Sequence, residues 1–262
     1  MSMYWVYDLP SWLFGLLTVA AIMAFGSAGL FATRKLVRRL HGVDHSHNDI
    51  VGFYLAAIAV FYGVTLGLVA VGTWTTYSDV EAKVDREATA IGALYRDVGS
   101  YPEPTRTELR DTLREYIRQV IDVGWPQQRK GIVPTGASAI LDKFQKQFFE
   151  FEPTTEAQRI ADAEAYGQFN VLVASRRARL DSVTSGLATP LWMMILLGAF
   201  ISIAVTWFFD TASFGMHFWM TGLLSALLGL MIFLVAALDN PYRGGVSVGP
   251  EPLERVYDQL MK

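Results

Sequence analysis

The residues that could bind a metal ion lie in one short segment of the chain. His41, His45 and His47 fall within a few positions of one another, next to carboxylates. On a helix, His41 and His45 would share a face because they lie four residues apart, and His47 or Asp49 could complete a zinc-type site. A solvated polar loop, with Asn48 or Asp49 capping the next helix, explains the same residues. We favour the loop interpretation and expect neither a bound metal nor a cofactor.

A second concentration of charge is the basic run formed by Arg176, Arg177 and Arg179. Arranged around the symmetry axis of an oligomer, this run would create a vestibule that attracts anions through focused positive potential. The simpler interpretation is that these side chains lie on solvated helix faces or form ion pairs between helices, with acidic residues such as Glu87 as partners. Both interpretations require helices to position the arginines.

Motifs of known catalytic centres are missing from the sequence. The chain has no cysteine, which excludes disulfides, thiolate zinc sites and cysteine nucleophiles. It also lacks a G-x-S-x-G elbow, a phosphate-binding P-loop, an H-E-x-x-H pair and a dinucleotide-binding glycine pattern. The net charge is −3, and the basic residues form no extended stripe that could follow a phosphate backbone. We therefore expect neither an enzyme nor a nucleic-acid-binding protein.

Four apolar stretches dominate the 262-residue chain, of which 52% is hydrophobic. Each is about twenty residues long, contains no Asp, Glu, Lys or Arg, and can cross a hydrocarbon core about 30 Å thick. The stretches are Trp12 to Ala32, Ile50 to Trp74, Pro190 to Phe209 and Met216 to Leu238. The sequence therefore predicts an all-α membrane protein with four transmembrane helices that contact the lipid bilayer.

The segment between the second and third spans is polar and has helical periodicity. One face of its first helix carries Val80, Val84, Ile91, Leu94, Tyr95 and Val98. No strong breaker follows Trp74, so the second span can continue into this segment as one helix, whereas Thr189 and Pro190 suggest the N-cap and first residue of the third span. The sequence therefore predicts four parts. Residues 1–74 form spans 1 and 2 with a basic loop at 33–48, and residues 75–186 form an extramembrane helical bundle inserted between spans 2 and 3. Residues 187–238 form spans 3 and 4, and residues 239–262 form a tail with a short helix.

Small residues form stripes along the spans. In the second span, Gly52, Gly63 and Gly67 fall within a narrow arc of the helix, and the fourth span carries Gly222 and Gly229. Small residues allow helix backbones to approach closely, and the spacing of Gly63 and Gly67 is typical of such contacts. Close helix packing is therefore the interpretation we favour, with a pore-lining face as the alternative for the second span.

The spans are almost free of charge, since His217 near one edge is their only basic or acidic side chain. Proton-coupled pumps and voltage sensors depend on ionisable residues within the membrane, so active transport is disfavoured. A passive pore built from a hydrophobic constriction and hydroxyl dipoles is compatible with the sequence. Its candidate lining residues are Phe61, Tyr62 and Thr65.

Orientation follows from the positively charged loops. Arg34, Lys35 and Arg39 lie in the short connection between the first two spans, which places that connection in the cytoplasm. Both termini and the helical bundle would then lie on the outer side of the membrane. Lys83 and Arg86 follow the second span on the opposite side of the membrane, so the difference in positive charge between the two sides is smaller than the first loop suggests.

Residues scattered over nearly the whole chain resemble one family. They are Asn48, Gly52, Tyr62, Gly67 and Trp74 of the second span, then Glu87-Ala88, Leu94-Tyr95-Arg96, Trp125-Pro126, the run from Arg176 to Arg179, and the closing motif with Asp239, Pro241 and Gly244. In this order they resemble the bestrophin-like prokaryotic membrane proteins, a family of uncharacterised function distantly similar to the bestrophin anion channels.

The resemblance implies a function and an assembly. Bestrophins are pentameric anion channels whose second span lines a hydrophobic neck and whose helical domain is cytosolic, in contrast to the charge count. By analogy, the chain would form a homo-oligomer that passes chloride-like inorganic anions passively. It lacks a recognisable neck sequence and acidic calcium clasp, so the resemblance does not extend to calcium gating. The alternative is a structural or signalling membrane protein whose helical bundle binds a partner or ligand, without transport.

Overall fold

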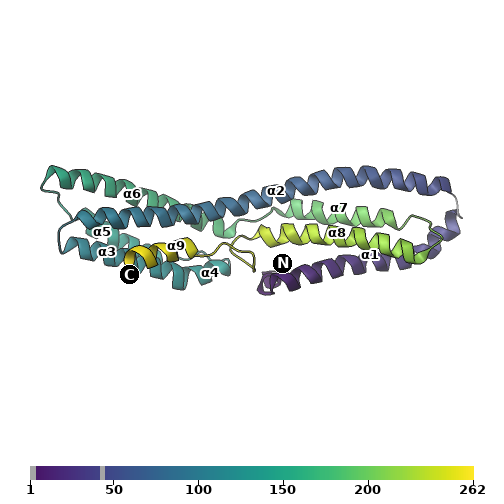
Figure 1. Cartoon of the computed structure of the whole chain (residues 1–262), viewed down its shortest axis with the longest axis horizontal. Helices are drawn as coiled ribbons and strands as arrows, with labels where there is room; N and C mark the ends of the chain where they lie inside the picture. Colours follow the sequence, from purple (N-terminus) through teal and green to yellow (C-terminus); the bar gives the residue numbers. More distant parts are fainter. Residues whose placement is uncertain (1–3, 42–44) are drawn as a thin grey trace. The chain divides into compact units, whose positions relative to one another are not determined.

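Long apolar helices give the protein its architecture. A computed structural model describes residues 4–41 and 45–262, and every regular element in these ranges is helical (Figure 1). Four helical segments are long and apolar enough to cross a membrane, namely Ser11–Val37, His47–Ser100, Thr189–Thr206 and Phe214–Asp239. The predicted fold, an all-α membrane protein with four spans, is confirmed.

Nine α-helices follow one another along the described ranges. They are α1 (Ser11–His41), α2 (His45–Asp97), α3 (Thr105–Arg118), α4 (Trp125–Arg129), α5 (Ala137–Phe149), α6 (Glu156–Asp181), α7 (Thr189–Thr206), α8 (Phe214–Asp239) and α9 (Glu251–Val256). Short 3-10 helices lie at Tyr4–Asp8, Val98–Ser100 and Ser182–Thr184, and π-helical turns at Gln119–Gly124 and Tyr257–Met261. The 53-residue α2 is continuous past Trp74, as the absence of a breaker there predicts.

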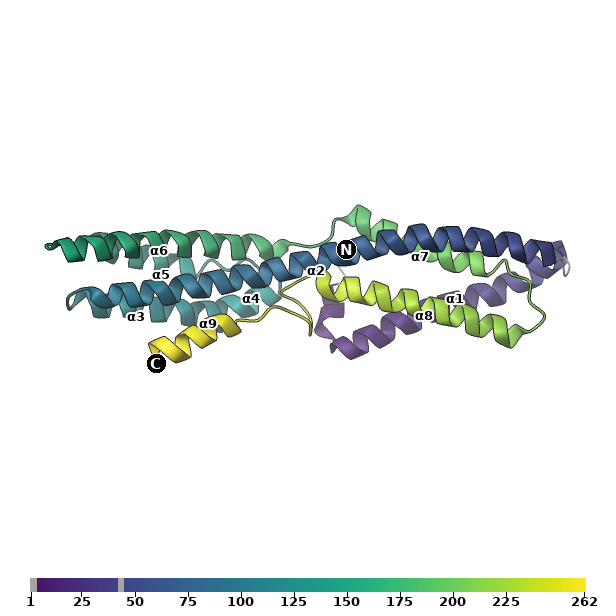
Figure 2. The ribbon, with the colours of Figure 1, turned by 45° about the horizontal axis from the view of Figure 1, so that its top comes forward.

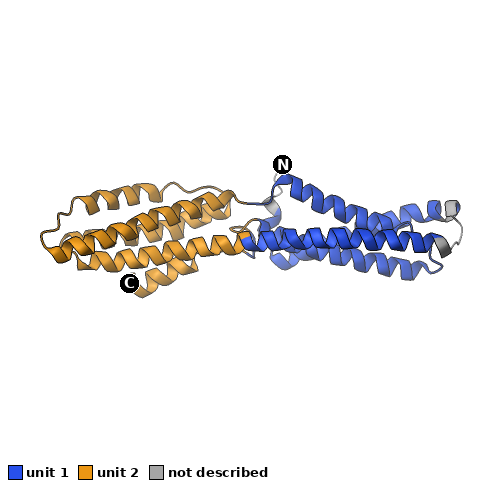
Figure 3. Cartoon of the chain, turned by 90° about the horizontal axis from the view of Figure 1, so that it is seen from above, with its two compact units in different colours: residues 1–75, 186–239, 244–246 blue, residues 76–185, 240–243, 247–262 orange. Residues whose placement is uncertain are grey.

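The chain divides into two compact units (Figure 3). The membrane unit consists of residues 1–75, 186–239 and 244–246, and the helical unit of residues 76–185, 240–243 and 247–262. Helix α2 supplies its first part to the membrane unit and its second part to the helical unit. Most of the C-terminal tail belongs to the helical unit.

In the membrane unit, α1 packs against α8, and the two ribbons cross in the view of Figure 2. Small residues allow this contact, because a Cβ atom added at Gly229 would lie only 2.9 Å from the Cα of Val19. A second apolar cluster joins α2, α7 and α8 through the buried side chains of Leu66, Ile195, Ala199, Ile232 and Val235. Helix α8 therefore contacts both α1 and the cluster with α2 and α7.

The helical unit has a continuous apolar core. The predicted face of its first helix is buried at Val80, Val84, Ile91, Leu94, Tyr95 and Val98. Opposite this face lie Leu113 and Ile117 of α3, Phe144 of α5, and Phe169 and Leu172 of α6, all within the same cluster. The 3.6-residue periodicity of the sequence thus identifies the buried faces of this bundle.

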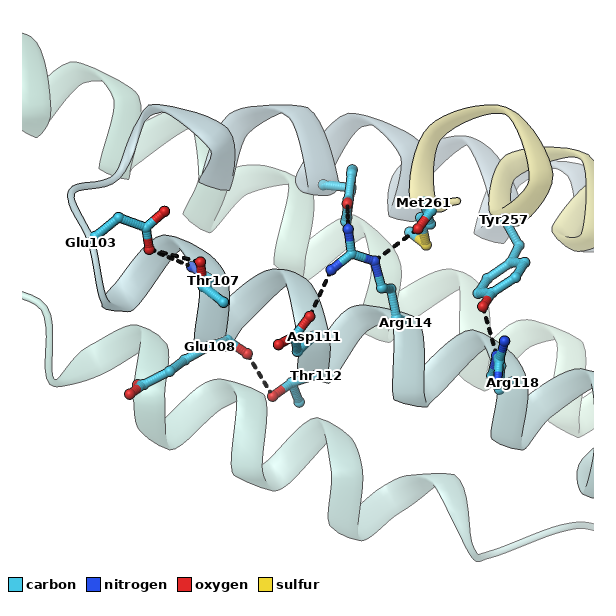
Figure 4. A network of polar contacts seen from close by, with 10 residues as sticks. Glu103, Thr107, Glu108, Asp111, Thr112, Arg114, Arg118, Tyr257 and Met261 are labelled. Carbon is cyan, nitrogen blue, oxygen red and sulfur yellow. Dashed lines mark hydrogen bonds and ion pairs between the residues drawn. The ribbon is translucent and has the colours of Figure 1, made fainter.

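The C-terminal tail is fixed to α3 by arginine side chains (Figure 4). The Nε atom of Arg114 donates to the carbonyl oxygen of Met261 at 2.9 Å, and its Nη1 atom lies 2.6 Å from a carboxylate oxygen of Asp111. One turn further along α3, Arg118 Nε donates to the hydroxyl of Tyr257 at 2.6 Å. Helix α9 and the π-helical turn after it are therefore part of the bundle.

Two boundary predictions are wrong. The segment predicted as a basic loop at 33–48 is largely helical, because α1 runs to His41 and α2 begins at His45; its arginine, lysine and leucine residues are good helix formers. The N-cap of α7 is Ala188 rather than Thr189, so Thr189 is the first helical residue and Pro190 follows it. Proline fits there because the first amides of a helix have no intrahelical acceptor, so the missing N–H of proline removes no hydrogen bond.

Candidate functional site

The part of α2 in the membrane unit has one covered and one uncovered face. Leu66 is buried in the cluster with α7 and α8, and Val69 packs against the same cluster. On the other side, Phe53, Val64 and Val71 are each 60% or more exposed. Since these side chains repeat at helical spacing, they form a continuous apolar face that no other described part of the chain covers. We refer to it as the outer face of α2.

The three candidate pore-lining residues differ in their surroundings. Phe61 is 77% exposed and belongs to the outer face. Tyr62 instead packs on α7, where its hydroxyl donates to the carbonyl oxygen of Ile195 at 2.8 Å and its ring lies against Gly198. The hydroxyl of Thr65 donates to the carbonyl oxygen of Phe61 at 2.7 Å, within the helix. All three border a shallow, mostly apolar hollow of about 390 Å³ between α2 and α7.

The glycines proposed for helix packing also fall into two groups. A Cβ atom at Gly229 would collide with the backbone of α1, whereas one at Gly222 or Gly52 would make only ordinary contacts, at 3.8 Å with Met23 and 3.9 Å with Phe209. Around Gly63 and Gly67, no atom of the described chain lies within 4 Å of such a Cβ. These two glycines therefore have no close packing contact with the described part of the chain.

The most deeply buried charges lie in the helical unit. Arg179 of α6 and Glu87 of α2 form an ion pair with side-chain exposures of 1% and 0%. The same glutamate accepts a hydrogen bond from the hydroxyl of Tyr116 at 2.6 Å, and Arg179 donates to the side-chain oxygen of Gln128 at 2.7 Å. A buried charge is tolerated only when paired and hydrogen-bonded in this way.

The ionisation of these groups is fixed by their surroundings. Burial alone would lower the pKa of Arg179, but the charge of Glu87 and the hydrogen bond to it outweigh burial and raise this pKa. Burial raises the pKa of the Tyr116 hydroxyl well above its ordinary value, and the Glu87 charge adds to the shift. Arg179 is thus a permanent cation whose charge is neutralised inside the bundle.

The basic run consequently separates into three environments. Arg179 is enclosed, Arg177 is exposed, and Arg176 is half-buried with its Nη2 atom donating to the hydroxyl of Ser138 at 2.8 Å. The interpretation of Arg179 and Glu87 as an inter-helix pair matches their geometry. An accessible vestibule surface at this run could be formed only by Arg176 and Arg177.

The closing sequence motif stabilises turns rather than forming a cluster. In the membrane unit, Asp239 accepts hydrogen bonds from the amide of Leu187 and, at 3.1 Å, from the indole of Trp192, near the start of α7. Gly244 has φ +80°, a conformation that side chains disfavour. In the helical unit, the carbonyl oxygen of Pro241 accepts from the amide of Val248 at 2.7 Å.

Two polar features escaped sequence reasoning. In the helical unit, the buried hydroxyl of Tyr242 lies 3.1 Å from that of Ser182 and donates to the carbonyl oxygen of Arg179 at 3.3 Å. In the membrane unit, the side-chain amide of Asn48 donates to the carbonyl oxygen of Asp210 at 2.6 Å and accepts from its amide at 2.9 Å. The sequence marked Asn48 as a candidate helix cap and as part of the family resemblance, but neither signal predicts its contact with Asp210.

The metal hypothesis gains no support from His47, whose Nε2 atom lies 2.9 Å from the carbonyl oxygen of Phe208. The side chains of His41 and His45 lie outside the described residues. Among the side chains that are described, no group of three histidine, aspartate or glutamate residues could hold a metal ion.

Comparisons with known proteins agree with this architecture. A crystal structure of a bacterial bestrophin homologue variant from Klebsiella pneumoniae is similar with a TM-score of 0.67 and 10% sequence identity, covering 95% of this chain and 99% of that chain. A second variant of the homologue gives a TM-score of 0.66 at 10% identity, over 93% and 98% of the two chains. No curated protein sequence matches. The bestrophin-like domain matches residues 20–253, and the chain therefore belongs to the bestrophin-like family.

Proposed function

We propose that the chain is the subunit of an oligomeric, passive channel for small inorganic anions such as chloride, with the outer face of α2 along the pore. The bestrophin-like family and fold support an ion channel in general and disfavour an enzyme. To this general function we add three proposals: selectivity for anions, a pore wall formed by α2, and assembly as an oligomer.

The uncovered outer face of α2 carries the proposal. It contains no charged side chain from Ile50 to Trp74, and Phe61 projects from it with 77% exposure. An aromatic side chain at this position in each subunit could form a hydrophobic constriction around a shared axis. Gly63 and Gly67 follow on the same helix without contacts in the described chain, which leaves room for another copy or for a permeant ion.

Flux measurements on purified protein in liposomes test this function. The wild-type protein should release a chloride gradient, and Phe61→Ala should change the rate by about tenfold or more, because trimming a constriction removes a barrier of about 1–2 kcal/mol or more. Leu16→Ala is the matched control, since it trims an equally apolar, 61% exposed side chain of α1. Absence of anion flux from folded, inserted protein would refute the proposal.

Assembly and membrane location need separate tests. A bestrophin-like channel would contain five copies of the chain, which native mass measurement of the detergent complex would count. A monomer in gentle detergent and in membranes would exclude a shared pore. We also propose the bacterial inner membrane with both termini outside, as the charged loops favour. Reporter fusions after Lys262 distinguish this orientation from the cytosolic one that the bestrophin resemblance implies.

A further inference from the structure

The connection between α4 and α5 exposes apolar and basic side chains together. Ile132 and Val133 are 54% and 43% exposed, and the side chains of Arg129 and Lys130 next to them are exposed as well. The sequence from Val123 to Leu141 contains no acidic residue. We refer to residues 129–133 as the α4–α5 loop. It presents an aliphatic pair beside two positive charges.

The backbone of the α4–α5 loop is held in a defined turn. Gly131 has φ +73°, and its amide donates to the carbonyl oxygen of Gln128 at 2.8 Å. The amide of Ile132 donates to the carbonyl oxygen of Gln127 at 3.0 Å. Together these bonds form the Schellman motif that ends many helices, in which the residue after the glycine frequently packs back on the helix. Ile132 occupies that position but remains more than half exposed, so the turn holds an aliphatic side chain where another molecule can cover it.

The α4–α5 loop is bonded to the segment that follows the last span. The Nη2 atom of Arg243 donates to the carbonyl oxygen of Lys130 at 2.8 Å. At the other end of α4, the ring of Trp125 packs against that of Tyr242, with 5.8 Å between the centroids. Arg243 follows Asp239, the last residue of α8, by only four residues, and four residues of chain extend over at most about 14 Å. The loop is therefore attached to a residue that must lie close to the end of a membrane span.

We propose that the α4–α5 loop is a docking surface for the anionic headgroups of the bilayer that contains the spans. Exposed aliphatic side chains next to a bilayer enter the boundary between headgroups and acyl chains, and basic residues beside them attract the anionic lipids. Each lysine or arginine near such a surface should enrich anionic lipid by about fivefold. This surface requires the protein to lie in a membrane but not to conduct ions.

Fluorescence quenching in a bilayer tests the docking surface. The chain has no cysteine, so Ile132→Cys gives a single site for a polarity-sensitive fluorophore. The labelled full-length protein is placed in nanodiscs of phosphatidylcholine and phosphatidylglycerol in equal parts, with a nitroxide quencher near the top of an acyl chain. The label at position 132 should be blue-shifted and quenched. Ile160→Cys is the matched control and should show neither effect, because Ile160 is 66% exposed and lies about 30 Å along α6 from Asp181, the end that leads to span α7.

A change in the lipid that carries the quencher tests the role of charge. At equal lipid fractions, a nitroxide on phosphatidylglycerol should quench the label at position 132 more strongly than the same nitroxide on phosphatidylcholine. Arg129→Gln combined with Lys130→Gln should lower this preference by about fivefold or more. Both side chains are exposed, so the melting temperature should stay unchanged. Arg159→Gln removes an exposed arginine beside Ile160 and should leave the preference as it is.

Three results would overturn the proposal. The first is a label at position 132 that is as polar and as poorly quenched as the label at position 160. The second is a blue-shifted label that neither lipid quenches, which would show that another protein molecule covers the loop. The third is equal quenching from the two lipids, which would exclude recognition of anionic headgroups. If the double variant does not fold, Lys130→Gln alone should still lower the preference, and an unchanged preference in that variant would contradict the role of the charge.

Discussion

The two parts of α2 differ in how far their apolar side chains are buried. In the helical unit, Val84, Ile91 and Leu94 of the segment from Thr76 to Asp97 are completely buried, each with no exposed area. In the membrane unit, the same helix leaves Phe53 and Phe61 more than 70% exposed. One continuous helix therefore carries a face that its own chain covers and a face that only lipid or another protein molecule can cover.

The surrounding solvent explains this difference. In water, exposed apolar surface costs about 25 cal/mol per Å², so the helical unit must cover its apolar faces with its own helices. Lipid tails are as apolar as leucine and impose no such cost, so membrane helices associate through close packing and polar contacts. An uncovered glycine-containing face is consequently stable in a membrane and available for contacts with other molecules.

The largest expected effect comes from breaking the charged interior of the helical unit. Arg179→Ala leaves the carboxylate of Glu87 buried without its ion partner and should destabilise the fold by about 3–5 kcal/mol. Thermal unfolding of the purified protein, followed by helical circular dichroism, measures the loss. Arg177→Ala changes the exposed neighbour and should alter stability by less than about 0.5 kcal/mol. Similar melting of the two variants would show that the helical unit does not depend on its buried pair.

A double substitution tests whether the loss of stability comes from leaving one buried charge unpaired. Glu87→Leu combined with Arg179→Met removes both charges and replaces them by apolar groups, which should recover much of the stability lost in Arg179→Ala. The recovery will be incomplete because Tyr116 and Gln128 lose their partners.

The second expected effect is an alkaline loss of stability through Tyr242. Burial raises the pKa of this hydroxyl to about 12, although the hydrogen bond with Ser182 and the Arg179 charge act in the opposite direction. The folded state thus keeps the proton to higher pH than the unfolded chain, whose tyrosine titrates near pH 10. The stabilising contribution is complete below about pH 10 and is lost as the pH rises through about 12, with a magnitude of about 2–3 kcal/mol.

Tyr242→Phe provides the measurement. At neutral pH this variant should be less stable than the wild type by about 1 kcal/mol, because the hydroxyl is bonded to Ser182 and to the carbonyl of Arg179. Its unfolding midpoint should fall less steeply between about pH 10 and 12 than that of the wild type. Parallel profiles would mean that Tyr242 does not contribute to the alkaline loss.

The sequence predicts much of the fold because hydropathy and periodicity are local properties. Runs without charge determine the four spans, and the missing breaker after Trp74 indicates that α2 can continue into the polar segment. The apolar positions from Val80 to Val98 repeat with helical spacing and are buried as expected. Helix ends were less predictable, since capping near Asn48 and Thr189 depends on tertiary contacts as well as residue type.

The candidate sites could not be predicted to the same extent, since they depend on partners distant in sequence. Glu87 and Arg179 are 92 positions apart, and nothing local distinguishes this buried arginine from the exposed Arg177. The contacts of the glycines could not be predicted from the sequence either. Gly63 and Gly229 both lie in small-residue stripes, yet only Gly229 contacts another helix of the described chain.

The third prediction uses this contrast between glycines. Gly229→Ala places a Cβ atom 2.9 Å from the Cα of Val19, where backbone must move to make room. The resulting overpacking of α1 against α8 should cost about 1–3 kcal/mol, measured as a lower unfolding temperature in detergent. Gly222→Ala is the matched control, because its nearest neighbour is the flexible end of Met23 at 3.8 Å. Equal melting of both variants would contradict close packing at Gly229.

The smallest effect on folding is expected at Gly63, where an added methyl group meets nothing within 4 Å in the described chain. Gly63→Ala should not lower the stability of the monomer, because the added methyl group meets no atom and alanine is a better helix former than glycine. If copies of the chain approach each other closely along the outer face of α2, the larger Gly63→Leu should nevertheless reduce the oligomer fraction in native mass measurement, because two backbones can no longer approach. An intact oligomer with Gly63→Leu would assign this part of the outer face to lipid or to an open pore.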